Sequence, residues 1–417
     1  MDSESVLVEP YRGFEEIVPV RQNATRMPDL RATDMPYPRS GHRLIANSRY
    51  AVAIGGYNPA LWNENNTPET YYPILKEVWL FNLMTKRWKK MATMGSMPKE
   101  LASHAALLHD NHIVVYGGTG VPFGHNSTSK VHVLNMTSGT WRMLTVSPAS
   151  GQSPNIPPEQ YGHALVRHKK KLYITGGTSG FDFNMQVFEL APNEDPITDA
   201  QSAFKCRSLL QGAELLPRYR HEAFFFDEKL HALGGGRTDT VCSLDTISVF
   251  DLATGRWSPV QSLPDPEQGF PAPRRCHGLA AYEEPSSAGR QLSVYISGGY
   301  DGSHGYDDVW ELQIKRGGSG VEYKWRHLPF DLPRRLYFHG MAATPDGCLL
   351  IFGGVDSDTD ERSSTMYRCY LKPPSLMETA LRKVMSCLGH MDEKKQLQVA
   401  DKLQFPQTCI DWLKNQW

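Results

Sequence analysis

Short apolar runs that end in paired glycines recur along the chain, and a histidine precedes each pair. The pairs are Gly55-Gly56, Gly117-Gly118, Gly176-Gly177, Gly235-Gly236, Gly298-Gly299 and Gly353-Gly354. The histidines are His42, His104, His163, His221, His277 and His339, which lead by about 13 or 14 residues in five of the six units. Successive pairs lie roughly 55–63 residues apart, a spacing typical of repeats that each form one supersecondary unit. The pattern predicts a repeat architecture of six similar units.

A complete unit has the pattern of four short β-strands, rich in β-branched and aromatic residues and bounded by turn residues. In the second unit these strands are expected at residues 103–109, 112–118, 130–136 and 140–145. An aromatic side chain opens the fourth strand of five units: Trp88, Trp141, Phe204, Trp257 and Trp325. We expect these side chains to pack between neighbouring sheets, while the glycines permit close backbone approach. The pattern predicts an all-β, six-bladed β-propeller over residues 37–372 and resembles the kelch repeat.

The sixth unit lacks a fourth strand of its own. After Gly354 only residues 365–371 form a strand-like run before two prolines. In the N-terminal region, residues 1–36, the segment at residues 14–21 carries β-formers and begins with an aromatic. We predict that this segment supplies the missing outer strand and closes the ring, because an unpaired sheet edge promotes aggregation.

Residues 373–417 change from strand to helix periodicity. Leu376, Ala380 and Val384 follow one another at a four-residue spacing, which places them on one face of a helix. Ser375 is a good N-cap for this helix. The periodicity predicts a small α-helical tail that follows the propeller.

Two further helices are expected in the tail, at residues 392–404 and after Phe405, where Pro406 would occupy the first helical position. A segment of about 45 residues is too short to bury several apolar helix faces within itself. The tail therefore packs either on the propeller or on a partner protein.

The composition argues against several other classes of protein. The net charge of −1 makes nucleic acid an unexpected partner, and the chain has no apolar run long enough for a membrane helix. The N-terminus lacks the apolar core of a signal peptide. The seven cysteines are odd in number and form no CxxC motif, as expected for reduced thiols rather than disulfides or a metal site. We expect a protein of the cytoplasm, with the nucleus as a further location, that has no cofactor.

Arginines cluster just before the histidines in four of the six units, and these units are contiguous once the ring closes. The first strand of each unit begins on the face where the second strand ends, so the arginines share that face with the residues that follow the glycines. Guanidinium groups bind carboxylates in a bidentate manner, and capture of a C-terminal carboxylate is a known recognition mode. The candidate ligand-binding residues are Arg39, Ser40, Tyr57, Tyr161, Arg218, Arg220, Arg274, Arg275, Tyr300 and Tyr337.

Each candidate has a structural alternative. The arginines can pair with neighbouring acids such as Glu222 and Asp356, and the tyrosines can pack at the ends of the blades. The six histidines occupy one repeat position, which favours a structural role for them. The alternation along the first strand leaves open whether Tyr219 or its two arginine neighbours face the axis.

Several motifs resemble the kelch domain-containing protein 10 family, including Arg39-Ser40-Gly41-His42, Arg218-Tyr219-Arg220-His221-Glu222 and Arg274-Arg275-Cys276-His277. The resemblance implies a substrate receptor of a cullin-2 RING ubiquitin ligase that binds extreme C-termini of substrates ending in a small residue such as Gly or Ala. In the tail, Ser375, Leu376, Ala380 and Val384 resemble an elongin BC-box, which implies contact with elongin C and elongin B. Phe405, Pro406, Trp412 and Leu413 resemble a cullin box, which implies contact with cullin-2.

Two other classes of function are known for kelch-like propellers. Some kelch-like propellers are copper radical oxidases, but here the histidines are spread around the ring and no nucleophile or metal motif stands out, so we expect no enzyme activity. A kelch scaffold or cytoskeletal interaction protein without a ligase role is the remaining alternative. That class would leave the motifs of the tail unexplained.

Overall fold

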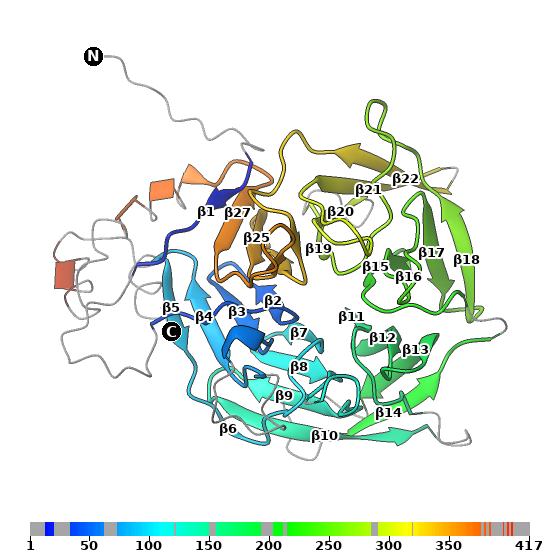
Figure 1. Ribbon diagram of the computed structural model, residues 1–417, viewed down its shortest axis with the longest axis horizontal. Helices are drawn as coiled ribbons and strands as arrows, with labels where there is room; N and C mark the ends of the chain where they lie inside the picture. Colours follow the sequence, from blue (N-terminus) through cyan, green and yellow to red (C-terminus); the bar gives the residue numbers. More distant parts are fainter. Residues whose placement is uncertain are drawn as a thin grey trace.

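The computed structural model describes the propeller region and isolated parts of the tail. The described residues are 13–20, 34–61, 73–120, 122–149, 156–192, 203–211, 215–284, 291–318, 320–376, 379–380, 383–384, 395, 398–399 and 402. Antiparallel sheets are arranged around a central axis, as Figure 1 shows. The architecture is an all-β propeller, which confirms this part of the predicted fold class.

Four of the sheets have four strands each. The first contains β2 (Arg43–Ala46), β3 (Tyr50–Ile54), β4 (Val78–Asn82) and β5 (Arg87–Lys90) in that order. The second contains β15 (Glu222–Phe226), β16 (Lys229–Leu233), β17 (Thr246–Asp251) and β18 (Arg256–Gln261). The third contains β19 (Gly278–Tyr282), β20 (Gln291–Ser297), β21 (Val309–Gly317) and β22 (Gly320–His327). The fourth contains β24 (Gly340–Ala343), β25 (Cys348–Phe352), β27 (Met366–Tyr370) and β1 (Glu15–Glu16), with β1 at its edge.

A nine-stranded sheet joins two runs of four antiparallel strands. One run is β7 (Ala105–His109), β8 (His112–Tyr116), β9 (Val131–Asn135) and β10 (Thr140–Pro148). The other is β11 (Ala164–His168), β12 (Lys171–Thr178), β13 (Phe183–Pro192) and β14 (Ala203–Ser208). The outer strands β10 and β14 pair in parallel, and β6 (Met94–Gly95) also pairs with β10. Elsewhere β23 (Leu336–Tyr337) pairs with β26 (Val355–Asp356), and η1 (Pro59–Leu61) is a short 3-10 helix.

The core lies between neighbouring sheets rather than within a single layer. Trp88 on β5 packs with its ring centroid 4.9 Å from that of Phe352 on β25, so an outer strand of one sheet covers the next sheet. Trp141, Phe204 and Trp325 are also buried, as the sequence predicts. Trp257 is only partly buried. The strand-opening aromatics therefore join the sheets through apolar contact, which is the main favourable term in folding.

The N-terminal segment is part of the ring. Strand β1 covers two residues of the predicted stretch and pairs antiparallel with β27, where Glu15 also forms an ion pair with Arg368. The backbone N–H of Val20 then donates to the carbonyl of Lys86 in the turn before β5, at 2.8 Å. The segment thus contacts both the last sheet and the first, and it covers a strand edge that would otherwise be unpaired.

The innermost strands surround the axis. Each innermost strand lies beside the next in the order β2, β7, β11, β15, β19 and β24, and β24 lies beside β2, which closes the circle.

In the tail, the residues with helical backbone include Leu376, Thr379, Ala380 and Val384. Within the described part of the chain, no helix has the length and apolar character needed to cross a bilayer.

Candidate functional site

Short segments lead into the innermost strands at one end of the propeller, and each ends in a repeated histidine. The segments are Arg39–His42, Leu101–His104, Gln160–His163, Arg218–His221, Arg274–His277 and Leu336–His339. Backbone bridges such as Ser40 to Tyr57 and Arg275 to Tyr300 tie them to the residues that follow the glycines. We call this end of the propeller the upper face.

The repeated histidines pack against the glycines and are buried. A Cβ atom on Gly117 would lie 2.4 Å from Cε1 of His163, the histidine of the following unit. A Cβ atom on Gly353 would lie 2.7 Å from Cε1 of His42, so the same contact joins the last unit to the first. Burial lowers the pKa of His163 to about 3, so the ring is neutral. The histidines are structural contacts between units.

The fourth unit differs slightly from the predicted pattern, because it contains three consecutive glycines. Gly234 contacts His277 and Gly235 contacts His221, as the first and second glycines of the other pairs do. The equivalent pair is therefore Gly234-Gly235, one residue earlier than the sequence pattern suggested.

Three of the candidate arginines are buried inside the units. The Arg39 guanidinium forms an ion pair with Glu77 at 2.5 Å and donates to the Gly55 carbonyl at 3.0 Å. Arg274 binds Asp308, with Nη2 2.8 Å from Oδ2, and also donates to the carbonyl of a paired glycine.

Arg218 donates to the carbonyl of Gly234 and to Ser248, both at 3.2 Å. Burial lowers the pKa of the Arg39 and Arg218 guanidinium groups. Arg39, Arg218 and Arg274, which the sequence offered as ligand-binding candidates, are therefore engaged with partners inside the units. Their donors are used to hold strand ends together, so moving them to the upper face would leave buried partners unsatisfied. Ser40 is also fully buried.

The residues just before the histidines form a closed circle of backbone hydrogen bonds. They are Gly41, Ser103, Gly162, Arg220, Cys276 and Phe338. Each N–H donates to the carbonyl of the preceding member at 2.7–3.1 Å, and Gly41 donates to Phe338. We call this circle the mouth ring. It encircles the axis at the point where the central channel meets the upper face.

Arg220 belongs to the mouth ring and is half-buried. Its Nη2 donates to the hydroxyl of Ser103, and its guanidinium lies 4.4 Å from the centroid of the Phe338 ring. Burial lowers the pKa of Arg220, so its charged form is desolvated in this position. Among the residues that the structure describes, no carboxylate forms an ion pair with it. A desolvated cation without an anionic partner is suited to an anionic ligand.

Aromatic side chains border the mouth ring on the upper face. Tyr161 and Tyr219 make an edge contact with centroids 6.4 Å apart, and Tyr300 stacks on Tyr337 at 5.1 Å. Tyr57 packs on Phe123 with centroids 4.8 Å apart. The candidate tyrosines Tyr57, Tyr161, Tyr300 and Tyr337 are all half-buried here.

Arg275 also reaches the upper face, and it is only partly buried. Its Nη1 donates to the backbone carbonyls of Arg237 and Thr238.

Sequence reasoning missed Ser103 and Phe338 as site residues. The available signal was that both occupy the same repeat position as Arg220.

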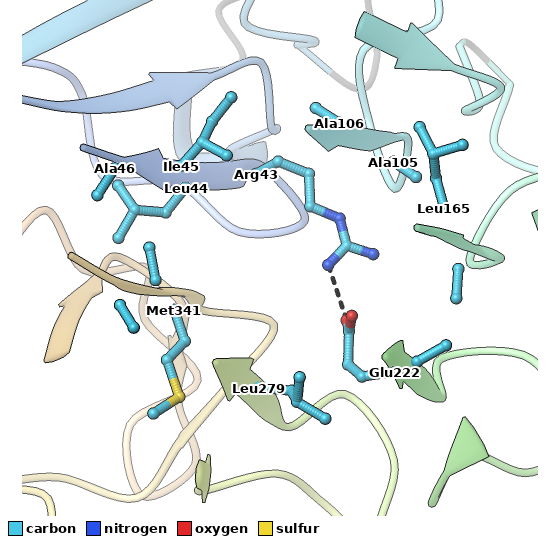
Figure 2. A pocket seen from close by; sticks show the side chains of 14 residues that line it. Arg43, Leu44, Ile45, Ala46, Ala105, Ala106, Leu165, Glu222, Leu279 and Met341 are labelled. Atoms are coloured by element: carbon cyan, nitrogen blue, oxygen red, sulfur yellow. Dashed lines mark hydrogen bonds and ion pairs between the residues drawn. The ribbon is translucent and has the colours of Figure 1, made fainter. Parts of the chain in front are cut away.

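A cavity of about 240 Å³ lies in the central channel, lined by residues of the innermost strands. Most of the residues that line it are apolar, but Arg43 on β2 and Glu222 on β15 reach across it to form an ion pair at 2.7 Å (Figure 2). These two strands lie three positions apart around the circle of innermost strands, so the ion pair joins opposite sides of the propeller. Among the described residues, no group of three or more His, Cys, Asp or Glu side chains is arranged to hold a metal ion.

Comparison with known proteins shows which family the chain resembles. A family model described as the KLHDC2/KLHL20/DRC7 Kelch-repeats domain matches residues 41–287. Human kelch domain-containing protein 10 is 32% identical over 405 residues, which cover 97% of this chain and 85% of the relative. The kelch domain-containing protein 10 homolog of Drosophila melanogaster is 30% identical over 363 residues, or 82% of this chain and 56% of the relative. Bovine kelch domain-containing protein 2 is 24% identical over 379 residues, which cover 85% of this chain and 86% of the relative.

Proposed function

The chain belongs to the kelch domain-containing protein 10 family of kelch-repeat proteins, and we propose that it is the substrate-recognition subunit of a cullin-2 RING ubiquitin ligase. In this proposal the propeller binds the C-terminus of a substrate protein on its upper face, and the tail binds elongin B and elongin C. The propeller itself is non-catalytic.

We infer that the propeller has six blades. The nine-stranded sheet then comprises two blades, β7–β10 and β11–β14, whose outer strands pair. The mouth ring supports this inference, because each of its members precedes the innermost strand of one blade. A closed circular arrangement of this kind brings side chains from every blade to the axis, where they can surround the end of a peptide.

The position of Arg220 is the observation that best supports the proposed recognition of a peptide. It is a half-buried cation at the mouth of the channel, and no described carboxylate pairs with it. The terminal carboxylate of a peptide supplies the missing anion and can accept charge-assisted hydrogen bonds from the guanidinium. The Phe338 ring lies 4.4 Å from the guanidinium, and Tyr161 and Tyr219, which contact each other, are electrostatic neighbours of Arg220, so bulky side chains border the space beside it. A small last residue such as Gly or Ala fits this arrangement.

Calorimetry with one Gly-ended peptide in two forms tests the recognition. The form with a free carboxylate should bind, and the form with a C-terminal amide should lose most of its affinity. An amide removes the negative charge while leaving the Arg220 cation desolvated and unpaired. Equal affinities would show that the upper face is not a carboxylate site.

The tail supports the second part of the proposal. Leu376 is 90% exposed, and its helical turn is defined by the N–H of Thr379, which donates to the carbonyl of Ser375 at 2.9 Å. Ala380 is also exposed, one turn further along. An exposed leucine beside a small residue suits insertion into a partner's pocket, with close approach of the helix backbone. The cullin-box residues Phe405, Pro406, Trp412 and Leu413 lie outside the described residues.

Co-purification with elongin B and elongin C tests the ligase role. The double variant Leu376→Ala and Ala380→Phe should lose both elongins, because it removes the anchoring side chain and places a bulky one at the close contact. Both positions are exposed, so the melting temperature of the propeller should not change. Pro406→Ala is the matched comparison and should weaken cullin-2 binding while elongin binding persists. If the double variant still retains the elongins, the BC-box assignment is wrong.

A further inference from the structure

The mouth ring holds side chains in a backbone conformation that they rarely adopt. All six members have φ between 55° and 64°, although only Gly41 and Gly162 are glycine. The other four are Ser103, Arg220, Cys276 and Phe338. Their backbone is in the left-handed region, where a residue with a Cβ atom is strained and glycine is not. Strain of this kind persists where the surrounding structure enforces it, and it is found at binding sites. The side chains at these positions therefore need an explanation.

The two glycines leave room for the side chain of Arg220. A Cβ atom on Gly162 would lie 3.3 Å from Cδ and 3.4 Å from Nε of Arg220. A Cβ atom on Gly41 would lie 3.8 Å from Nη2 of Arg220 and 3.5 Å from the hydroxyl of Ser103. The side chain of Arg220 thus passes Gly162 and ends near Gly41 and Ser103. Larger residues at either glycine would crowd this path.

Two of the strained residues hold the head of Arg220. Ser103 accepts a hydrogen bond from Nη2, and the Phe338 ring lies under the guanidinium with 4.4 Å between the guanidinium carbon and the ring centroid. The hydrogen bond fixes one end of the group, and the cation–π contact fixes its plane. Because both partners belong to the mouth ring, their backbones are held by its hydrogen bonds.

We propose that Ser103 and Phe338 are positioning residues that hold the Arg220 guanidinium ready for a C-terminal carboxylate, and that the chain keeps them at the expense of backbone strain. The proposal rests on the proposed function, in which Arg220 binds that carboxylate. It adds that the geometry of the cation is prepared before the ligand arrives. Preorganisation of this kind lowers the entropy lost on binding.

Ser103→Gly separates the two effects of the residue. The variant relieves the left-handed strain and matches Gly41 and Gly162, so we expect a melting temperature at or slightly above that of the parent. It also frees the Arg220 head, so binding of a Gly-ended peptide with a free carboxylate should weaken by about tenfold, the effect of one side chain that must be ordered. The weak binding of the matching amide should not change.

Asp110→Gly is a matched control. Asp110 has φ of 50° and directly follows the last residue of β7, whereas Ser103 lies before the first residue of that strand. The two residues are therefore at opposite ends of β7. The substitution relieves the same kind of strain away from the upper face, so peptide affinity should stay at the parent value. Phe338→Leu is a second variant that keeps an apolar side chain and the same backbone but removes the ring face. It should also weaken binding of the acid peptide selectively.

The outcomes separate this proposal from the proposed function. A parent protein that does not distinguish acid from amide overturns both. If the parent prefers the acid and Ser103→Gly binds it equally well, only the positioning role is overturned. An equal loss of acid and amide binding in Ser103→Gly also overturns it, because that result would place the effect on the fold rather than on the carboxylate contact.

Discussion

Replacing Arg220 with Gln is expected to abolish the preference of the propeller for a peptide that ends in a free carboxylate. The variant keeps a polar side chain in the mouth ring but removes the half-buried cation that lacks a described anionic partner. Breaking one side of a desolvated charge pair costs about 3–5 kcal/mol, which corresponds to a loss of more than about a hundredfold in affinity. Titration calorimetry of the parent and the variant, each with the acid and amide forms of one Gly-ended peptide, measures this difference.

Arg334→Gln is a suitable control for that experiment. Arg334 is more than half exposed and already pairs with Asp356 at 2.8 Å, so its charge is compensated. This variant should keep the preference for the acid peptide. A preference that survives in Arg220→Gln would show that another cation, with Arg275 as the first candidate, binds the carboxylate.

The two arginines of the fourth unit show why the site was only partly predictable. Arg218 and Arg220 are two residues apart and look equivalent in the sequence, where both are candidate ligand-binding residues. In the structure Arg218 is directed into its own blade, where it binds Gly234 and Ser248, whereas Arg220 lies in the mouth ring. The difference depends on the left-handed backbone of Arg220, which reorients its side chain. Local propensity does not reveal that conformation for an arginine.

The repeat itself contained a usable signal. Glycine stands at two of the six mouth-ring positions, and glycine is the residue expected where φ is positive. Alignment of the six units would therefore have indicated that Arg220 and Phe338 share an unusual backbone. The buried ion pairs were harder to predict, because Glu77 and Asp308 lie far from Arg39 and Arg274 in the sequence and meet them only after each blade folds.

The fold was predictable because its determinants repeat. Two contacts recur around the axis: a glycine packs beside a histidine ring, and an aromatic side chain at the start of an outer strand is buried. Because these contacts repeat from unit to unit, the sequence pattern predicts them. The N-terminal strand was identified from the missing partner of the last unit, but its regular pairing is confined to Glu15 and Glu16. Beyond them the chain turns to the first sheet through Val20, a path that strand propensity alone does not specify.

Acid should begin to unfold the propeller at a pH above that at which most carboxylates are protonated. Burial lowers the pKa of His104, His163 and His277 to about 3 and that of His339 to about 4, and it holds the pKa values of His42 and His221 well below their usual value. In the unfolded chain a histidine titrates near pH 6.5. Below that pH the unfolded state binds more protons than the folded state, so the free energy of unfolding falls as the pH falls.

The histidine contribution is fully present above about pH 6.5 and is lost progressively toward the folded pKa values. Each histidine gives a slope of about 1.4 kcal/mol per pH unit in this window, so the six together approach roughly 8 kcal/mol per pH unit. Because domains are stable by about 5–15 kcal/mol, we expect cooperative unfolding at 25 °C between about pH 6 and pH 4.5. Circular dichroism during denaturant titration at several pH values measures the slope. His304→Gln is the control, because that side chain is 80% exposed and its loss should leave the slope unchanged. A propeller that keeps its neutral-pH stability at pH 4.5 would show that the ring histidines accept protons without unfolding.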